Sequence, residues 1–222
     1  MSTGTIITRL KDLVGKTDAQ IYLIIGPPGS GKEAFAMQYL IDGFTENDNG
    51  VFLTTDCFPN EIIDKMKKMG KNPDSFITSK QLQFIDAFSY RTGEKVEHDD
   101  LSVENIRDLT NLSVIIKELI DSKSKLRLVI NTISTISIYN SGIALLDFTQ
   151  AQVARLKQKN HSGILIAHEG MLEEKVIQGI KAIVDGVIQF EPFEDQSGVL
   201  KRRLRVVYAP NIKKSGWVSL EQ

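Results

Sequence analysis

One glycine-rich segment near the N-terminus constrains this chain more than any other feature. Residues 26–33 read GPPGSGKE, which fits the phosphate-binding pattern G-x-x-x-x-G-K-[S/T] at every fixed position except the last. An apolar run at 21–25 leads into the segment, and residues 34–42 have the pattern of a helix. Strand, glycine loop and helix in this order form the context that a phosphate-binding loop requires.

The residue types in this loop suit an anion. Glycines allow a tight turn in which consecutive N–H groups point inward, and the helix N-terminus adds the positive end of its dipole. Lys32 supplies a mobile charge for β- and γ-phosphates. A glycine-rich turn that binds nothing is the alternative, but it has no need for three glycines and a lysine in this register. We therefore expect a nucleotide-phosphate site made of Gly26, Pro27, Pro28, Gly29, Ser30, Gly31, Lys32, Glu33 and Ala34.

Glu33 is the departure from the pattern. A Ser or Thr at this position would place its hydroxyl on Mg²⁺. A carboxylate can also bind Mg²⁺, but it adds negative charge beside the phosphates. Glutamate is equally a favourable residue in the first turn of a helix, where it needs no metal at all. Both interpretations predict abnormal Mg²⁺ binding at the loop.

Length and composition limit the class of protein. The 222 residues suit one α/β domain, and we expect it to span 1–222, with a helical lead-in at 1–19 and a β-meander at 184–222. The net charge of −1 gives no global attraction to nucleic acid or to anionic membranes. A single cysteine, Cys57, excludes an internal disulfide and fits a reducing compartment. No apolar run approaches the ~20 residues of a membrane span, so we expect a cytoplasmic protein.

Strand-like and helix-like segments alternate along most of the chain, and the last three strand-like segments follow one another. This pattern predicts a mostly parallel sheet flanked by helices, with an antiparallel extension. Ligands bind such sheets beyond the carboxyl ends of the strands, where Gly26, Asp56, Asn131 and His168 lie. Residues 89–100 read as a surface loop. Helices are expected at about 6–14, 34–42, from 59, from 102, 142–159 and 172–182, and strands at 21–25, 51–55, within 82–88, 126–130, 163–167, 184–190, 200–208 and 216–220.

This order of parts resembles the RecA superfamily and, within it, the KaiC-like ATPases. Residues 22–40 around the loop, 50–63 and 128–136 carry the resemblance, together with a stretch from 163 that includes DGVI at 185–188 and RRLRVV at 202–207. These segments cover most of the chain from about 20 to 210. The resemblance implies a RecA-like P-loop fold and ATP or ADP as the ligand.

The resemblance also shows which catalytic residues are missing. After the second strand the family usually carries a glutamate that activates water, and the matching positions here are Asp56 and Cys57. Asp56 can polarise water, but its side chain is one methylene shorter, and a turn or capping role fits it as well. Asn131 replaces the Walker B aspartate; its amide can orient water but brings no charge to hold Mg²⁺. Glu33 and Asn131 are therefore the candidate metal ligands, and His168 is either a sensor of the γ-phosphate or simply a hydrogen-bonded histidine.

A cation pair of the family is missing too. In KaiC-like rings a Lys-x-Arg pair reaches the neighbour's nucleotide, and the matching positions are Tyr208 and Pro210. Lys213 and Lys214 follow closely and either substitute for the pair or form a solvated turn. Together with the other departures, this loss indicates a protein that keeps the phosphate-binding loop but lacks the residues needed for ATP hydrolysis.

The strand expected at 200–208 is basic. Its two-residue period places Lys201, Arg203 and Arg205 on one face. Such a face can bind a nucleic-acid backbone or an acidic partner. Outward charges on an exposed antiparallel strand are the more ordinary explanation, and the segment has no interleaved aromatic residues to stack bases.

The sequence therefore predicts a domain that binds ATP or ADP, hydrolyses ATP weakly or not at all, and acts as a regulator or scaffold through a protein partner or self-association. Two alternatives remain. One is an active ATPase with Asp56 as the base. The other is a recombinase-paralogue module that binds DNA through the basic strand.

Overall fold

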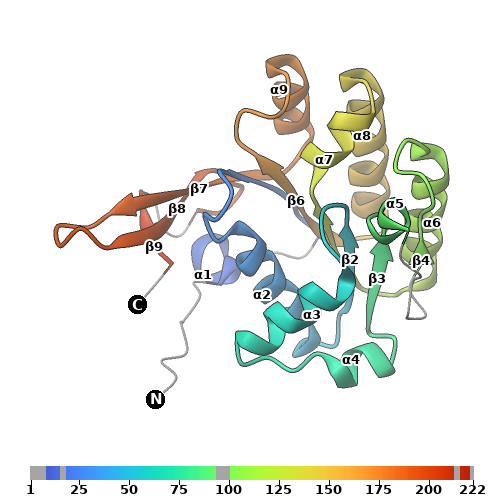
Figure 1. Cartoon of the computed structure of the whole chain (residues 1–222), viewed down its shortest axis with the longest axis horizontal. Helices are drawn as coiled ribbons and strands as arrows, with labels where there is room; N and C mark the ends of the chain where they lie inside the picture. The colour runs from blue at the N-terminus through green and yellow to red at the C-terminus, as the bar shows by residue number, and fades with distance from the viewer. Residues whose placement is uncertain (1–8, 16–18, 94–100, 213–215, 221–222) are drawn as a thin grey trace.

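A single twisted sheet forms the centre of the molecule (Figure 1). The computed structural model describes residues 9–15, 19–93, 101–212 and 216–220. Strands within these ranges follow the spatial order β4-β3-β2-β5-β6-β1-β7-β8-β9. Their bounds are β1 Ile21–Gly26, β2 Asn49–Thr54, β3 Leu82–Asp86, β4 Leu101–Ser102, β5 Leu126–Asn131, β6 Ser162–His168, β7 Gly186–Glu194, β8 Leu200–Tyr208 and β9 Val218–Ser219.

The strands from β4 to β7 are parallel to their neighbours, and β8 and β9 add antiparallel pairs at one edge. This arrangement confirms the predicted fold class. The central strands are buried on both faces and read as continuous apolar runs, as expected for a parallel sheet covered by helices.

Helices cover both faces of the sheet (Figure 1). Alternate residues of β1 separate the two cores: Ile24 packs with the side chains of α1 to α3, whereas Leu23 packs with those of α6 to α9. The helix bounds are α1 Leu10–Val14, α2 Lys32–Phe44, α3 Pro59–Lys68, α4 Asp74–Thr78, α5 Ser89–Thr92, α6 Leu109–Ser122, α7 Ile133–Tyr139, α8 Gly142–Gln158 and α9 Glu174–Ile183.

The helix expected from about residue 102 was placed too early. Residues 101–102 form the edge strand β4, and α6 begins at Leu109. Val103 and Ile106 are buried as predicted, but an irregular segment carries them into the core. Asp108 then caps the helix by accepting a hydrogen bond from the Asn111 N–H at 2.9 Å. Three-residue spacing of apolar side chains therefore did not require a helix here.

Other boundaries also differ from the expectations. Helix α7 was not predicted, and the side chain of Thr132 caps it through the Thr135 N–H at 3.1 Å. The expected surface loop begins with the short helix α5, whereas residues 94–100 lie outside the described ranges. Residues 6–8 of the expected first helix also lie outside them. Among the described helices, none has the length and apolarity to cross a membrane.

The sheet brings the predicted strand ends to one edge. Gly26 at the end of β1 lies opposite His168 at the end of β6. Thr54 at the end of β2 lies opposite Asn131 at the end of β5. Residues that follow these strands therefore surround the start of α2, which is the geometry that a ligand site on a parallel sheet requires.

Candidate functional site

The glycine-rich loop connects β1 to α2. Gly29 and Gly31 have φ angles of +76° and +91°, and a Cβ on Gly31 would lie 3.1 Å from Leu220 Cδ1 and 3.2 Å from Arg202 Cδ. The backbone conformation favours glycine at 31, and the space for a Cβ there is tight. Phe35 begins the helical hydrogen bonding by donating its N–H to the Gly31 carbonyl at 3.0 Å. The loop thus stands directly before a helix N-terminus, as the sequence predicted.

Lys32 is the first residue of α2 and has no exposed surface. Its Nζ donates to the Pro27 carbonyl oxygen at 3.0 Å and lies 2.9 Å from Glu33 Oε1. The ammonium is thus held inside the loop by its own neighbours. A phosphate in the loop would have to compete with the Glu33 carboxylate for the charge of Lys32.

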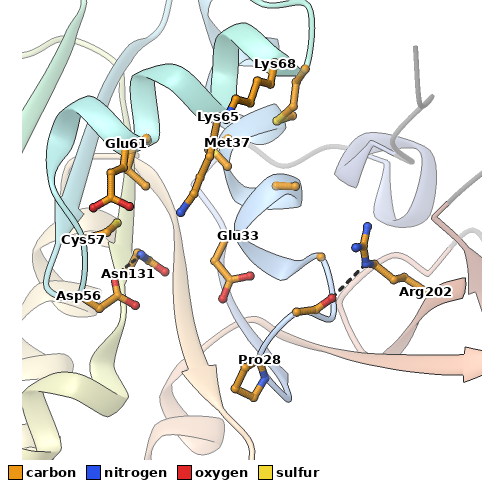
Figure 2. A pocket seen from close by; sticks show the side chains of 15 residues that line it. Pro28, Glu33, Met37, Asp56, Cys57, Glu61, Lys65, Lys68, Asn131 and Arg202 are labelled. Atoms are coloured by element: carbon orange, nitrogen blue, oxygen red, sulfur yellow. Dashed lines mark hydrogen bonds between the residues drawn. The ribbon is translucent and has the colours of Figure 1, made fainter. Parts of the chain in front are cut away.

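A groove of about 890 Å³ opens beside the loop (Figure 2). It runs between the start of α2, the residues after β2, the end of β5 and the length of α3. The groove is large enough for a nucleotide-sized ligand. Its lining consists of Pro28, Gly29, Gly31, Glu33, Ala34, Met37, Asp56, Cys57, Glu61, Ile62, Lys65, Lys68, Met69, Asn131 and Arg202.

Asp56 and Asn131 meet at the floor of the groove (Figure 2). Asn131 Nδ2 donates to Asp56 Oδ1 at 2.9 Å, and this bond fixes the orientation of the amide. Desolvation in the groove, followed by the negative charge of Glu33, raises the pKa of Asp56, although its side chain still reaches solvent. Asn131 Oδ1 is buried and has no hydrogen-bond partner. The two predicted residues therefore form one polar unit with a free acceptor.

Cys57 does not offer a reactive group. Its thiol is buried, and burial raises the pKa to about 11, so the group is protonated at neutral pH. Thr54 Oγ1 donates to the Cys57 carbonyl at 2.6 Å and lies 3.4 Å from the sulfur. The side chain therefore packs as a small apolar residue beneath Asp56.

His168 lies beside the loop at the end of β6. Its backbone N–H donates to Ser134 Oγ at 2.9 Å, while its Nδ1 is buried without a partner. Burial and the nearby charge of Lys32 lower the pKa of His168, so the ring is neutral at physiological pH. Ser30 Oγ in the loop is also buried and without a partner. Unsatisfied buried polar atoms are uncommon and costly, and polar groups of a ligand in the loop would satisfy these.

The residues of the groove fit phosphate better than they fit Mg²⁺. The loop amides and Lys32 can donate hydrogen bonds to phosphate oxygens. The two candidate metal ligands are less suitable, because Glu33 is paired with Lys32 and Asn131 offers only a neutral amide. Throughout the described part of the chain, no group of three or more His, Cys, Asp or Glu side chains could hold a metal ion.

Sequence reasoning missed three basic residues that line the groove. Arg202 on β8 donates its Nε hydrogen to the Gly29 carbonyl at 3.0 Å, so the antiparallel edge contacts the loop directly. Lys65 and Lys68 project from α3 along the opposite wall. The alternation of β8 did place Arg202 on the face opposite Arg203, but only the tertiary fold shows that this face meets the loop.

The positions that match the family's cation pair lie far from this loop. Tyr208 pairs with Val187 at the start of β7, which is the opposite end of the sheet. Its hydroxyl donates to the Lys181 carbonyl. Lys213 and Lys214 lie outside the described residues.

Neighbouring side chains pair with the basic face of β8. Lys201 forms an ion pair with Asp195, Arg203 with Glu191, and Arg205 donates to Gln189. The strand itself carries no interleaved aromatic residue, but its neighbours supply two. The Trp217 ring lies 4.5 Å from the Arg203 guanidinium and 4.9 Å from that of Arg205, and the Phe193 ring lies 4.8 Å from Arg203. The segment thus lacks interleaved aromatic residues, as its sequence indicated, while residues outside it place two rings against its arginines.

Comparisons with known proteins agree with this geometry. A family model described as "ATPase: KaiC" matches residues 3–211. A UPF0273 protein of Thermotoga maritima is 27% identical over 86% of this chain and 79% of its own length. A UPF0273 protein of Pyrococcus horikoshii is 22% identical over 86% of this chain and 77% of its own. In fold, the chain is similar to the crystal structure of a KaiC-like protein from Pyrococcus horikoshii, with a TM-score of 0.75, 17% identity and coverage of 99% and 94%.

Proposed function

This chain belongs to the KaiC family of ATPases, and we propose that it binds ATP or ADP through residues 26–34 while hydrolysing ATP slowly or not at all. The observation that carries the proposal is the contrast within one groove. The phosphate-binding loop keeps its glycines and Lys32, which is buried inside it. By contrast, Asn131 is hydrogen-bonded to Asp56, and Glu33 is paired with Lys32.

Loss of hydrolysis is supported by the arrangement of Asp56. A general base must lie within hydrogen-bond reach of the attacking water. One oxygen of Asp56 already accepts the Asn131 amide, and its side chain is shorter than that of the family's glutamate. Phosphoryl transfer also depends on metal ions and on a cation for the developing charge. Glu33 is paired with Lys32, so Mg²⁺ is expected to improve ATP binding little.

A regulatory or scaffolding role is supported by the contact between the loop and the antiparallel edge. Arg202 donates to Gly29, and Leu220 packs where a larger residue at 31 would stand. Nucleotide in the loop can thus bias the position of β8 and β9, whose outer face carries Arg203, Arg205 and Trp217. A protein partner or a second copy of the chain would read the nucleotide state from this edge. We further propose one domain over 1–222 and a cytoplasmic setting, which the continuous sheet and the buried free thiol of Cys57 support.

Multiple-turnover phosphate release tests the proposal against the active-ATPase alternative. We expect almost no phosphate above background, with tight nucleotide binding in the same preparation. Sustained release that Asp56→Asn abolishes would instead identify Asp56 as a working base.

DNA binding is the second candidate, because Trp217 and Phe193 stack on the arginines of β8. Bases stack on such aromatic side chains, but Glu191 offsets the charge of Arg203. Single-stranded DNA that binds with an affinity falling steeply with salt, and that Arg205→Gln weakens, would support this function.

A further inference from the structure

Helix α3 carries a lysine that the phosphate-loop pattern does not account for. Ile62, Ile63 and Met66 of this helix are buried against the core, so its orientation is fixed. Glu61, Lys65 and Lys68 follow a spacing of four and three residues and therefore share the face that lines the groove. Figure 2 shows the Lys65 side chain pointing from α3 into the groove, toward the side where Asp56 and Glu33 lie.

The ammonium of Lys65 is not used elsewhere in the described part of the chain. Glu61 is four residues before it and is the usual helical partner, but its carboxylate accepts the Phe58 N–H at 3.2 Å at the start of the helix. Among the described residues Lys65 forms no ion pair within 4.0 Å, whereas the neighbouring Lys67 pairs with Asp74 at 2.9 Å. The charge of Lys65 does reach the groove floor, where it opposes the rise in the pKa of Asp56.

The groove needs such a cation when a triphosphate is bound. The charge of Lys32 is shared with Glu33, and Asp56 adds further negative charge to the floor. Asn131 Oδ1 is a buried acceptor without a partner and cannot hold a phosphate oxygen, which is also an acceptor, so the charge for the terminal phosphate has to come from the basic side chains that line the groove.

We propose that Lys65 contacts the terminal phosphate of ATP from within the same chain and makes the groove prefer ATP over ADP. Lys65 takes no part in holding the phosphates that ADP shares with ATP. The inference rests on the proposed nucleotide binding and adds a residue that sets which nucleotide the site selects. A regulator that distinguishes ATP from ADP without turnover needs a group of this kind.

Calorimetric titration of the full chain with ATP and with ADP tests this inference. Lys65→Gln is expected to weaken ATP binding by about tenfold, as for loss of one charge-assisted bond in an open site, and to leave ADP binding nearly unchanged. Lys65→Arg should keep most of the preference for ATP. Lys67→Gln is the matched control, because it removes the same charge from the same helix at a side chain that pairs with Asp74 outside the groove lining.

The results for Lys65→Gln and Lys67→Gln distinguish failure of this inference from failure of the proposed function. Equal losses for ATP and ADP, or no loss for ATP, would overturn the inference, and so would an equal effect of Lys67→Gln. If the unmodified protein binds neither nucleotide, the proposed function fails together with the inference; if it binds both and Lys65→Gln changes nothing, only the inference fails. Lys65 is exposed, so the variant is expected to fold, and its thermal unfolding profile checks this.

Discussion

Replacing Lys32 by alanine removes the only charged side chain that is buried inside the phosphate-binding loop. Its Nζ is held by the Pro27 carbonyl at 3.0 Å and by Glu33 at 2.9 Å. A phosphate in the loop would replace part of this coordination with a charge-assisted hydrogen bond. Such bonds contribute about 1.5–3 kcal/mol, so Lys32→Ala should weaken nucleotide binding by about 10- to 150-fold.

Glu33 decides where in this range the loss falls. Because Glu33 shares the charge of Lys32 in the unmodified protein, it moves the loss toward the lower end. Once Lys32 is gone, however, the unpaired carboxylate repels the phosphates and increases the loss. Glu33→Gln alone should tighten nucleotide binding, and a double-mutant cycle with Lys32→Ala separates the two effects. Without Glu33, the Lys32→Ala loss is larger than in the parent if charge sharing dominates and smaller if repulsion dominates.

The titration can be followed through Trp217, the only tryptophan, which stacks on Arg203 in the strand that also contacts the loop through Arg202. Calorimetry provides a measurement that does not depend on this reporter. Thermal unfolding of each variant shows whether the loop still folds. Unchanged affinity of a folded Lys32→Ala protein would mean that residues 26–34 form only a structural turn.

Dissociation constants for ATP should be similar with Mg²⁺ and with a chelator, and a gain of about tenfold or more with Mg²⁺ would show that a metal site persists. The triple variant Glu33→Thr, Cys57→Glu and Asn131→Asp should hydrolyse ATP slowly at best, because catalytic groups that act as a unit are not restored one at a time. Phosphate release measures this, and ATP hydrolysis at ~1 s⁻¹ by any variant with a single substitution would contradict it. Folding raises the pKa of Asp56, so the stability that this carboxyl contributes is full below its ordinary pKa and is lost as pH rises through the raised value. Asp56→Asn should therefore flatten the dependence of thermal unfolding on pH across the acid range. An unchanged pH dependence in this variant would argue against the raised pKa. Arg127 is buried and holds Asp48 at 2.7 Å, so Arg127→Met should reduce the free energy of unfolding by about 3–5 kcal/mol in denaturant titrations, and a loss near zero would show that the pair is dispensable.

The loop and the strand order that places it were predictable because they depend on local patterns. The motif at 26–33 and the apolar strands fix a parallel sheet, and the carboxyl ends of its strands then gather Asp56, Asn131 and His168 at one edge. The hydrogen bond between Asp56 and Asn131 was not predictable, since it depends on the register of β2 against β5 over 75 residues of sequence separation.

The parts that sequence reasoning missed depend on longer-range packing. Arg202 reaches Gly29 across 173 residues of separation, and the stacking of Trp217 on β8 needs a third strand to return beside it. Lys65 differs in nothing local from Lys67, and only the packing of α3 against the core decides which of them faces the groove. The helix prediction for residues 102–108 was wrong because a local pattern was misleading. The apolar spacing is helical, but an irregular segment buries Val103 and Ile106.

The identity of the bound nucleotide over time tests the central claim most directly. The protein, in excess over ATP and with Mg²⁺ present, is separated from free nucleotide at intervals, and the bound fraction is analysed for ATP and ADP. The account predicts that ATP binds and stays intact over many minutes, with Lys32→Ala as the control that retains little nucleotide. Conversion of bound ATP to ADP at ~1 s⁻¹, the low end of ordinary enzyme turnover, or the absence of any bound nucleotide, would contradict it.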